Sequence, residues 1–543
     1  MRFDQRFCAR TAVTAGLFAA AVSVFGPSPV HAQTTPAMPA GTVNTAQQGP
    51  VRRLSIDDAV ATALEQNLDL QVQRYNPQLQ DLTITQFKAA YTPNFVSQIS
   101  TADNTQPSTS ILDSGGTGTA GITSGNSIFN FGVSSLTNWW GGSYDVRFNN
   151  TRSTTTNLLQ SFSPQLNNVV SASYSQPLLR NFRIDGARQQ LIVSQKNKEI
   201  TDVQLQTSIT QTTRNVRNAY YDLVGAIGNL AVQRQSLQLS QQSLKDNRAR
   251  VEIGTMAPLD IVQAEAEVAT REEAVIIAEA AIERLMDALR SLVYNPSSAD
   301  FWTARIEPTD TLTFVPVTVD TDGAVKKALT DRTDLQNARK NLEINDVNIS
   351  YFRNQSLPDV TASVNYNARA IGGLQVRRAP DPANGGLPTG AIISQAEQSY
   401  FETLRSTLAG DFPGWNVQFN IAYPIGKSPQ EAQLARARLA QTQGERQIQS
   451  LELDVTTQVR DAARNVTTGA KRVDATRQSR ILAERRLEAE EKKFQAGMTQ
   501  SFFVLTAQRD LNVARNNELL ALVEYAKAVV NYGAVQQAPL VGQ

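Results

Sequence analysis

The chain has 543 residues, and its 51 basic and 50 acidic side chains leave a formal net charge of +1. This balance excludes the basic surplus that is typical of nucleic-acid-binding proteins. The sequence contains no uninterrupted apolar run of about 18 residues or more, so it predicts no membrane-spanning helix. The length alone would suit roughly three or four ordinary domains.

The first 32 residues have the pattern of a cleaved export signal. Three arginines precede an apolar core over residues 11–26, and Val30-His31-Ala32 follows as a small-x-small cleavage motif. We expect a signal peptide over 1–32 and a mature start at Gln33, the alternative being a retained anchor. The single cysteine, Cys8, and the single histidine, His31, would leave with it. Cys/His metal sites and nucleophile–histidine catalysis are then excluded, so we expect no enzyme, metal or cofactor.

The segment WNVQFNIAYP, which begins at Trp415, alternates apolar and polar residues. A period of two describes a strand with one apolar and one polar face. Similar segments adjoin other prolines, and each has about nine to eleven residues, enough to cross a bilayer when tilted. Strands are therefore expected near residues 94–102, 168–176, 359–368 and 415–423. Residues 144–148 also alternate, but the sequence does not define the structure of the insert at 101–167.

The polar residues of these strands are Asn, Ser, Thr and Gln rather than charged residues, which favours a wall between lipid and water. The expected lipid-facing residues, with an aromatic belt at the two ends, are Trp415, Val417, Phe419, Ile421 and Tyr423. The expected pore-facing residues are Asn416, Gln418 and Asn420. The alternative is a soluble β-core filled by these aromatics. Four strands cannot close a barrel and lipid does not tolerate an open sheet edge, so we expect an oligomer.

Two parts of the chain resemble each other. LSIDDAVATALEQNLDLQ from Leu54 matches VDTDGAVKKALTDRTDLQ from Val319 at an offset of 265. RQSLQLSQQSL from Arg234 matches RQSRILAERRL from Arg477 at an offset of 243. Such a duplication decides the architecture. We expect a flexible segment, two repeats and a tail, over residues 33–53, 54–318, 319–538 and 539–543.

Proline-free runs predict a long helix and a return helix in each repeat. The long helices are expected over 184–253 and 430–496, and the return helices over 258–293 and 501–532. Apolar spacings of three and four indicate coiled-coil seams. Gly254 and Gly497 suit the left-handed position after a helix end, and Pro258 suits a helix start. Each repeat thus ends in a helical hairpin distant from its strands, the alternative being a soluble coiled-coil rod.

With this plan, the chain resembles the TolC-like outer membrane efflux proteins over about residues 54–533. The resemblance is carried by the duplication, by the strand ends SYSQPL and IAYPI, and by two turn motifs. These motifs are RVEIGTMAPLDIVQAEAEV from Arg250 and KFQAGMTQSFFVLTAQRDL from Lys493. The resemblance implies an all-α fold with membrane β-structure. Three protomers would form an α-helical barrel of long coiled-coil hairpins, continuous with a twelve-stranded transmembrane β-barrel that takes four strands from each protomer.

The resemblance also implies the function of a passive exit duct in a tripartite efflux pump. The homotrimer would lie in the outer membrane of a Gram-negative bacterium, with its helices in the periplasm. It would export small molecules when docked to a periplasmic adaptor (membrane fusion) protein and an inner-membrane pump of the RND or ABC type. Two alternatives remain open: the exit duct of a type I protein-secretion system, and a structural coiled-coil trimer without transport. The substrate, the pump and the adaptor cannot be read from the sequence.

In this family the hairpin turns close the periplasmic entrance. One aspartate of the first turn is held there by a tyrosine and an arginine of the second. The aspartate corresponds to Asp260, whereas Phe494 and Thr499 stand at the tyrosine and arginine positions. The resemblance therefore implies a polar lock that is only partly available in this chain.

Two further family aspartates form an acidic ring at the narrowest point of the entrance. Phe503 and Thr506 stand at these positions, so the ring is absent as well. We expect closure by apolar packing of Phe502 or Phe503, since a dry constriction can gate a channel by dewetting. The alternative is that both phenylalanines belong to the ordinary core between helices.

Overall fold

The computed structural model describes residues 50–107, 121–254, 256–298, 300–426 and 428–540. The predicted signal peptide and most of the segment at 33–53 lie outside the described residues. The described residues belong to one compact unit of the chain. Among the helices of the described ranges, none has a stretch long and apolar enough to cross a membrane.

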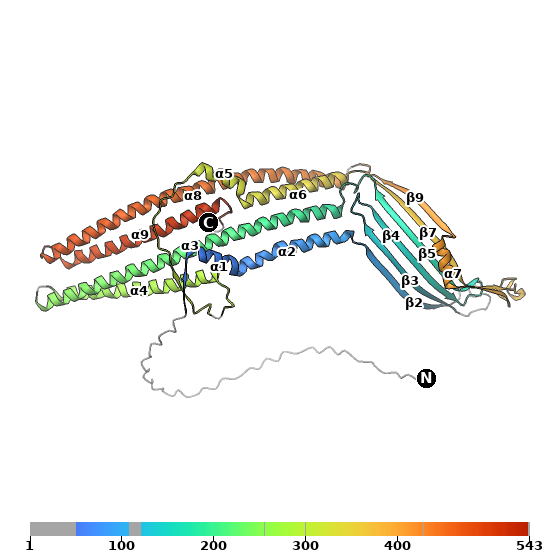
Figure 1. Cartoon of the computed structure of the whole chain (residues 1–543), viewed down its shortest axis with the longest axis horizontal. Coiled ribbons are helices and arrows are strands. Elements are labelled where there is room, and N and C mark those ends of the chain that lie inside the picture. Colours follow the sequence, from blue (N-terminus) through green and yellow to red (C-terminus); the bar gives the residue numbers. More distant parts are fainter. Residues whose placement is uncertain (1–49, 108–120, 255, 299, 427, 541–543) are drawn as a thin grey trace, which may run out of the picture. The chain divides into compact units, whose positions relative to one another are not determined.

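The first half of the described chain passes through short elements and a set of strands into a helical hairpin (Figure 1). Its elements are β1 (Val51–Leu54), α1 (Ile56–Gln66), α2 (Leu68–Lys88), η1 (Ala89–Tyr91), β2 (Asn94–Gln106), β3 (Ile122–Leu136), β4 (Ser143–Thr155), β5 (Phe162–Pro177), α3 (Gly186–Glu252) and α4 (Pro258–Val293). The α3 helix has 67 residues, which at 1.5 Å per residue corresponds to about 100 Å.

The second half has a similar order of helices and ends in a second hairpin. Its elements are β6 (Arg305–Pro308), α5 (Thr321–Asp331), α6 (Thr333–Gln355), β7 (Asp359–Arg378), η2 (Pro382–Asn384), β8 (Ile392–Gln398), α7 (Tyr400–Ala409), β9 (Pro413–Ala422), α8 (Pro429–Gln495) and α9 (Ser501–Val535). The α8 helix also has 67 residues.

The segment expected to be flexible ends in a strand, which corrects its boundary. Residues Val51–Leu54 form β1 and pair in parallel with β6. The strand is held because Leu54 is buried in an apolar cluster and its carbonyl accepts a 3.0 Å hydrogen bond from the Tyr220 hydroxyl. Ordered structure therefore begins before residue 54.

The large sheet is antiparallel and runs in the order β2-β3-β4-β5-β7. Two strands, β9 and β8, lie one after the other along the free side of β7 and together form one column of the sheet. β9 pairs with Asp359–Ala368 of β7, and β8 pairs with Gly373–Arg378. In the described part of the chain the sheet therefore has seven strands in six columns. The expectation of four strands per protomer is wrong, because part of the insert folds as the β3–β4 hairpin inside the sheet.

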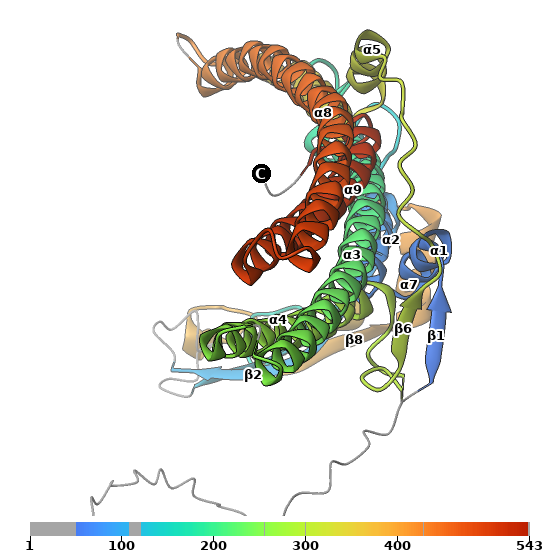
Figure 2. The ribbon, with the colours of Figure 1, turned by 90° about the vertical axis from the view of Figure 1, so that its left-hand side faces the viewer.

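The long helices lie side by side in the order α4-α3-α9-α8. Figure 2 shows these four helices arranged along an arc. Nearer the sheet, α2 and α6 take the places of α4 and α9, and the helices lie side by side in the order α2-α3-α6-α8. Helix α7 packs on β5 and β7, where it covers Ala368 and Ala370 at the end of the sheet distant from the long helices. The helical layer and the sheet thus share their edges: α2 leads into β2, and β9 leads into α8.

Two glycines of α3 lie directly against α9 of the other hairpin. A Cβ atom at Gly225 would lie 2.6 Å from the Cγ2 atom of Val523, and one at Gly228 would lie 3.0 Å from the Cδ1 atom of Leu519. Neither contact leaves room for a methyl group unless the α9 side chain moves. The α3–α9 contact therefore depends on small residues in α3.

We expect the Gly225→Ala substitution to lower the midpoint of thermal unfolding. The overpacking costs about 1–3 kcal/mol, which exceeds the gain in helix propensity of about 1 kcal/mol. Gly533→Ala in α9 is the matched control, because a Cβ atom there meets nothing within 4 Å. Circular dichroism of the two purified variants checks the prediction, and equal midpoints would contradict it.

Candidate functional site

The turns of both hairpins depend on a glycine in the left-handed conformation. Gly254 follows α3 with φ +77°, and Gly497 follows α8 with φ +73°. A Cβ atom at either glycine would meet nothing within 4 Å, so backbone conformation rather than space explains the residue. Pro258 is the first residue of α4, where its missing N–H costs no hydrogen bond. The two chain reversals follow directly from these residues.

Asp260 lies in the first turn of α4 and connects the two hairpins. Its Oδ1 atom accepts a 3.1 Å hydrogen bond from the hydroxyl of Ser501, which is the first residue of α9. Ser501 is only 6% exposed. The family resemblance placed Phe494 and Thr499 at the positions of the two residues that hold this aspartate. It did not indicate Ser501, which carries no distinctive sequence signal.

Phe494 belongs to the packing of its own hairpin. It lies against the apolar cluster of Leu487, Val504, Ala507 and Leu511, which joins α8 to α9. Its ring is also covered by the guanidinium of Arg250 in α3, whose carbon lies 4.3 Å from the ring centroid. A cation over an aromatic ring contributes about 0.5–1 kcal/mol when exposed. Phe494 therefore links α3 to α8 through its ring.

Phe502 and Phe503 lie at the start of α9 and are 55% and 49% exposed. Their rings contact each other edge to face, with centroids 5.7 Å apart. Thr506 is directed back along the helix, where its hydroxyl donates to the carbonyl of Phe502 at 2.8 Å. Within the single chain these phenylalanines are thus half-exposed, whereas the apolar cluster of the hairpin consists of other residues.

A buried carboxylate further along the hairpins joins α4 to α9 by a charged contact. The Glu267 side chain is 4% exposed. Its Oε2 atom lies 2.5 Å and 2.9 Å from two nitrogens of Arg509, and its Oε1 atom accepts a 2.7 Å bond from Arg271. Sequence reasoning missed this group. The feature of the sequence that could have indicated it is a charged residue three positions after Ala264, on the buried side of the helix α4.

Burial and pairing act in opposite directions on this carboxyl. Burial alone would raise the pKa of Glu267, but the hydrogen bonds from Arg509 and Arg271 outweigh burial and hold the pKa below its usual value. At neutral pH Glu267 is therefore ionised. It is the shared acceptor of one arginine on its own helix and one on the other hairpin.

Further polar contacts continue along the α3–α9 interface. The ammonium of Lys527 lies 2.8 Å from a carboxylate oxygen of Asp222. Arg515 donates to the side-chain carbonyl of Gln235 at 2.9 Å and also pairs with Glu484 of α8. These contacts extend the connection between the hairpins well beyond their turns.

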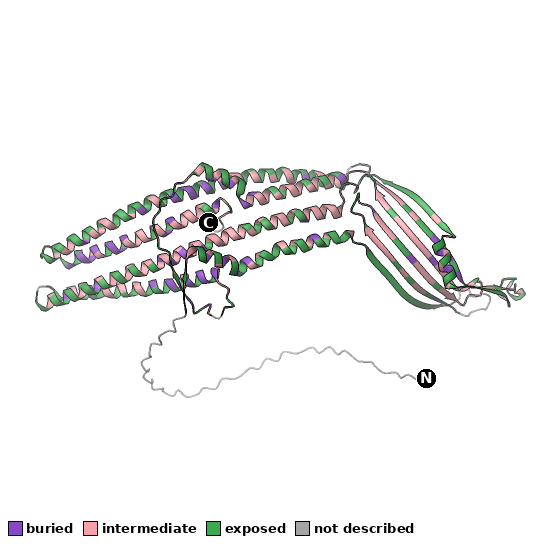
Figure 3. Cartoon of the chain, in the orientation of Figure 1, coloured by how far each residue is buried: buried purple, intermediate pink, exposed green. Residues whose placement is uncertain are grey.

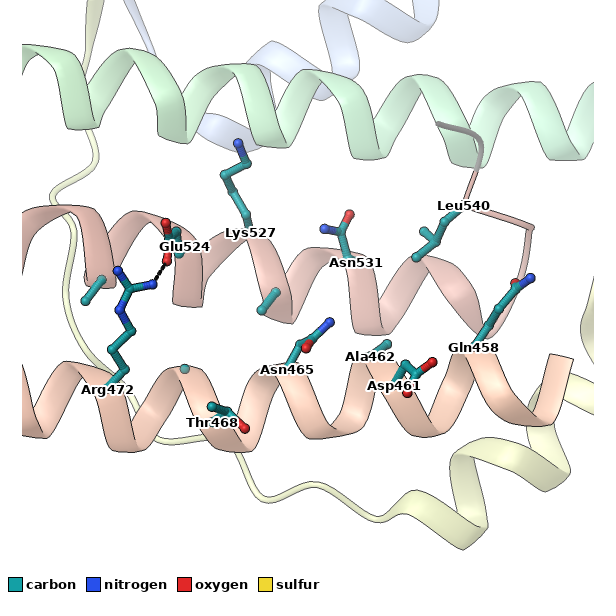
Figure 4. Close-up of a pocket in the computed structure, with 13 residues that line it drawn as sticks. Gln458, Asp461, Ala462, Asn465, Thr468, Arg472, Glu524, Lys527, Asn531 and Leu540 are labelled. Carbon is teal, nitrogen blue, oxygen red and sulfur yellow. Dashed lines mark hydrogen bonds and ion pairs between the residues drawn. The ribbon is translucent and has the colours of Figure 1, made fainter. Parts of the chain in front are cut away.

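A surface cavity of about 490 Å³ lies between α8 and α9 (Figure 4). Small residues such as Ala462, Gly469 and Ala528 leave the space between the two helices. Its charged side chains are already paired: Arg472 with Glu524, Lys527 with Asp222, and Asp461 with Arg464. The cavity therefore has the character of a packing gap rather than of a ligand site.

A sequence profile described as outer membrane efflux protein matches residues 142–293 and 324–531. The chain belongs to the outer membrane efflux protein family. The matched ranges contain both helical hairpins and most strands of the sheet. This is a family of channels rather than enzymes. A comparison with curated protein sequences found no match.

Solved structures of outer membrane channels share the fold of this efflux protein. CmeC of Campylobacter jejuni is 14% identical, with a TM-score of 0.61 over 89% of this chain and 85% of that chain. VceC of Vibrio cholerae is 15% identical, with a TM-score of 0.60 over 89% and 96%. The open state of MtrE of Neisseria gonorrhoeae is 14% identical, with a TM-score of 0.59 over 89% and 88%. At these identities the likeness establishes the fold.

Proposed function

We propose that the protein is a passive exit duct of a tripartite efflux pump, located in the outer membrane with its helices in the periplasm. Three copies would close into one channel, and small molecules would leave through it. The observation that carries the proposal is that the helical layer and the sheet have the same two edges, α2 with β2 on one side and α8 with β9 on the other. The helical layer and the sheet end at the same two sides, so copies placed edge to edge would continue both layers at once.

The free edge of the helical layer supports assembly with further copies. Helix α2 exposes an apolar stripe with alternating spacings of four and three, which is the pattern of a coiled-coil seam. The stripe consists of Leu68, Val72, Tyr75, Leu79 and Leu82, which are 44–67% exposed. A neighbouring α8 would cover this stripe, because α8 is the opposite edge of the layer.

The exposed apolar residues at the hairpin turns support docking of an adaptor protein there. Ile253 and Leu259 of the first hairpin are 74% and 66% exposed, and Met498 of the second is 78% exposed. Such residues clustered at one end of a protein are typical of an interaction surface. An inner-membrane pump of the RND or ABC type would supply the energy and the choice of substrate.

Conductance of the purified protein in planar lipid bilayers tests the proposal. We expect discrete, long-lived conductance steps from the trimer without any nucleotide or other energy source. A trimer that inserts but conducts no ions would support the alternative of a structural envelope protein. A protein that remains monomeric in detergent and lipid would contradict the duct itself.

We expect the Phe503→Ser substitution to raise the single-channel conductance about twofold or more, because an apolar constriction excludes water and ions until it is widened or made polar. Val513→Ser is the matched control, since Val513 is a 60% exposed apolar residue further along the same helix. Unchanged conductance in Phe503→Ser would assign this residue to packing rather than to the gate.

A further inference from the structure

The β3–β4 hairpin is a full part of the sheet rather than a loop on its surface. β3 pairs with β2 from Ser134↔Asn94 to Ile122↔Gln106. On its other side β3 pairs with β4 over 13 residue pairs, and β4 pairs with β5 over 11. The hairpin thus separates β2 from β5 along their whole length.

One row of paired residues crosses all six columns of the sheet on the same face. It consists of Trp415, Tyr366, Ala172, Val146, Val133 and Phe95, in the order from β9 to β2. Every member is apolar or aromatic. On β3 the same face continues with Phe131 and Phe129, which are 41% and 45% exposed. The hairpin therefore carries the same apolar face as the strands on either side of it.

The adjacent row, on the opposite face, is polar in every column. It consists of Asn416, Asn365, Ser173, Asp145, Ser134 and Asn94. Two such rows that run through every column, at the end of the sheet nearer the long helices, are the pattern of a wall with lipid on one side and water on the other. In these two rows β3 and β4 carry the same alternation as the outer strands, whereas nearer α7 the apolar face of β4 includes Asn150 and Arg152.

We propose that three copies of this chain close into an eighteen-stranded β-barrel, with six strand columns from each copy. The proposal rests on the trimeric duct proposed above and goes beyond it in the number of strands. The two edges that must meet, β2 and β9, are exposed almost throughout in the single chain (Figure 3). Closure is required because unpaired backbone groups are not tolerated in lipid.

The directions and the register of these edges fit such a closure. Because the column number is even and neighbouring strands are antiparallel, β9 of one copy meets β2 of the next in antiparallel orientation. Both strands join the helical part at Ala422 and Asn94. Pairing these two residues places the two strands face for face, with Gln418 opposite Gln98 on one face and Ile421 opposite Phe95 on the other. A slip by one residue would place the apolar face of one strand beside the polar face of the other.

The stagger of the sheet also matches the tilt of a closed barrel. Trp415 lies seven residues before the end of β9, whereas Phe95 of the same row lies one residue after the start of β2. From β2 to β9, over five steps between neighbouring strands, the row therefore shifts by six residues relative to the strand ends that join the helices. At about 3.3 Å per residue and about 4.8 Å per step, this corresponds to a strand tilt of about 40°. Barrel strands are typically tilted by about 35–45°.

The strand number sets the width of the exit. Because barrel diameter grows roughly linearly with strand number, eighteen strands give a barrel about 1.5 times as wide as twelve. Barrels of about 16–18 strands leave an aqueous channel. The polar row that contains Asn416 and Asp145 would line this channel. The β-barrel would then be wide enough that it does not limit the size of the exported molecule.

Fluorescence quenching by brominated lipids tests whether the hairpin faces the bilayer. Single cysteines are introduced by Phe131→Cys, by its neighbour Asn130→Cys and by Phe419→Cys, with Cys8→Ser to remove the only natural cysteine. Each full-length variant is labelled with bimane and reconstituted into phosphatidylcholine vesicles with and without brominated chains. We expect at least about twofold quenching at positions 131 and 419 and little at position 130, because quenching requires contact with lipid chains.

The outcomes separate this proposal from the duct on which it rests. Quenching at position 419 without quenching at 131 would leave a membrane barrel and overturn the eighteen-stranded wall. Absence of quenching at both positions would overturn the membrane duct as well. A second measurement needs no substitution: electron cryo-microscopy of the unmodified trimer in lipid nanodiscs. Eighteen strands in the wall would support the proposal, and twelve would overturn it.

Discussion

Replacing Glu267 with glutamine should weaken the contact between the two hairpins and raise the conductance of the channel. The substitution keeps the shape of the side chain but removes the charge that Arg509 and Arg271 share. Breaking a fully buried ion pair costs about 3–5 kcal/mol. We expect a smaller loss here, because the Arg509 side chain is 58% exposed while Glu267 is buried. Thermal unfolding and single-channel conductance of the purified variant measure the two effects.

Glu265→Gln is the matched control for this experiment. Glu265 lies two residues away on the same helix, but it is 48% exposed and pairs with Arg248 inside the first hairpin. Exposed pairs contribute only about 0–1 kcal/mol, so this variant should behave like the natural protein. If the two glutamine variants have the same unfolding midpoint and conductance, Glu267 does not hold the hairpins together.

The same pair predicts the direction of a pH effect. The pKa of Glu267 in the folded protein is below its ordinary value of 4.5, because its hydrogen bonds from arginine outweigh burial. Its contribution to stability is therefore present above the unfolded pKa and is lost as the pH falls through the lower, folded value. Conductance of the natural protein should rise in that acidic range, and the Glu267→Gln variant should lose this rise.

Replacing Phe419 with arginine should prevent assembly in the outer membrane. Phe419 is 64% exposed and lies on the apolar face of β9, near the middle of the strand. An arginine that faces lipid at the middle of the bilayer costs about 2–4 kcal/mol, and a trimer would bear this cost three times. Membrane fractionation and trimer detection by gel electrophoresis without heating should find little assembled protein.

Gln418→Arg provides the control on the opposite face of the same strand. Gln418 is one residue away, and its side-chain amide lies 2.8 Å from the side-chain oxygen of Asn420. A charge on this face would meet the water of the pore, so the trimer should form and its conductance should become more anion-selective. The opposite result, with assembly of Phe419→Arg and failure of Gln418→Arg, would reverse the two faces of the sheet.

The sequence predicted the helical part closely because its signals are local. The first return helix is expected over residues 258–293, and α4 spans Pro258–Val293. Helical periodicity, a proline at the first turn and a glycine after the last one act within a few residues of each other. The entrance was harder to predict. Asp260 was identified, but its partner Ser501 lies 241 residues away and has no distinctive pattern around it.

By itself, the sequence determined the long helices, their turns and the two-faced strand at Trp415, because each depends on spacing along one segment. Only the tertiary structure decided how many strands the sheet contains and which residues join the hairpins. The β3–β4 hairpin is rich in Ser, Thr and Asn, so its alternation is weak until pairing with β2 and β5 aligns it. Likewise, Glu267 and Arg509 are 242 residues apart, and folding alone brings the carboxylate and the guanidinium together. Strand pairing and buried charges are non-local, which is why periodicity could not reveal them.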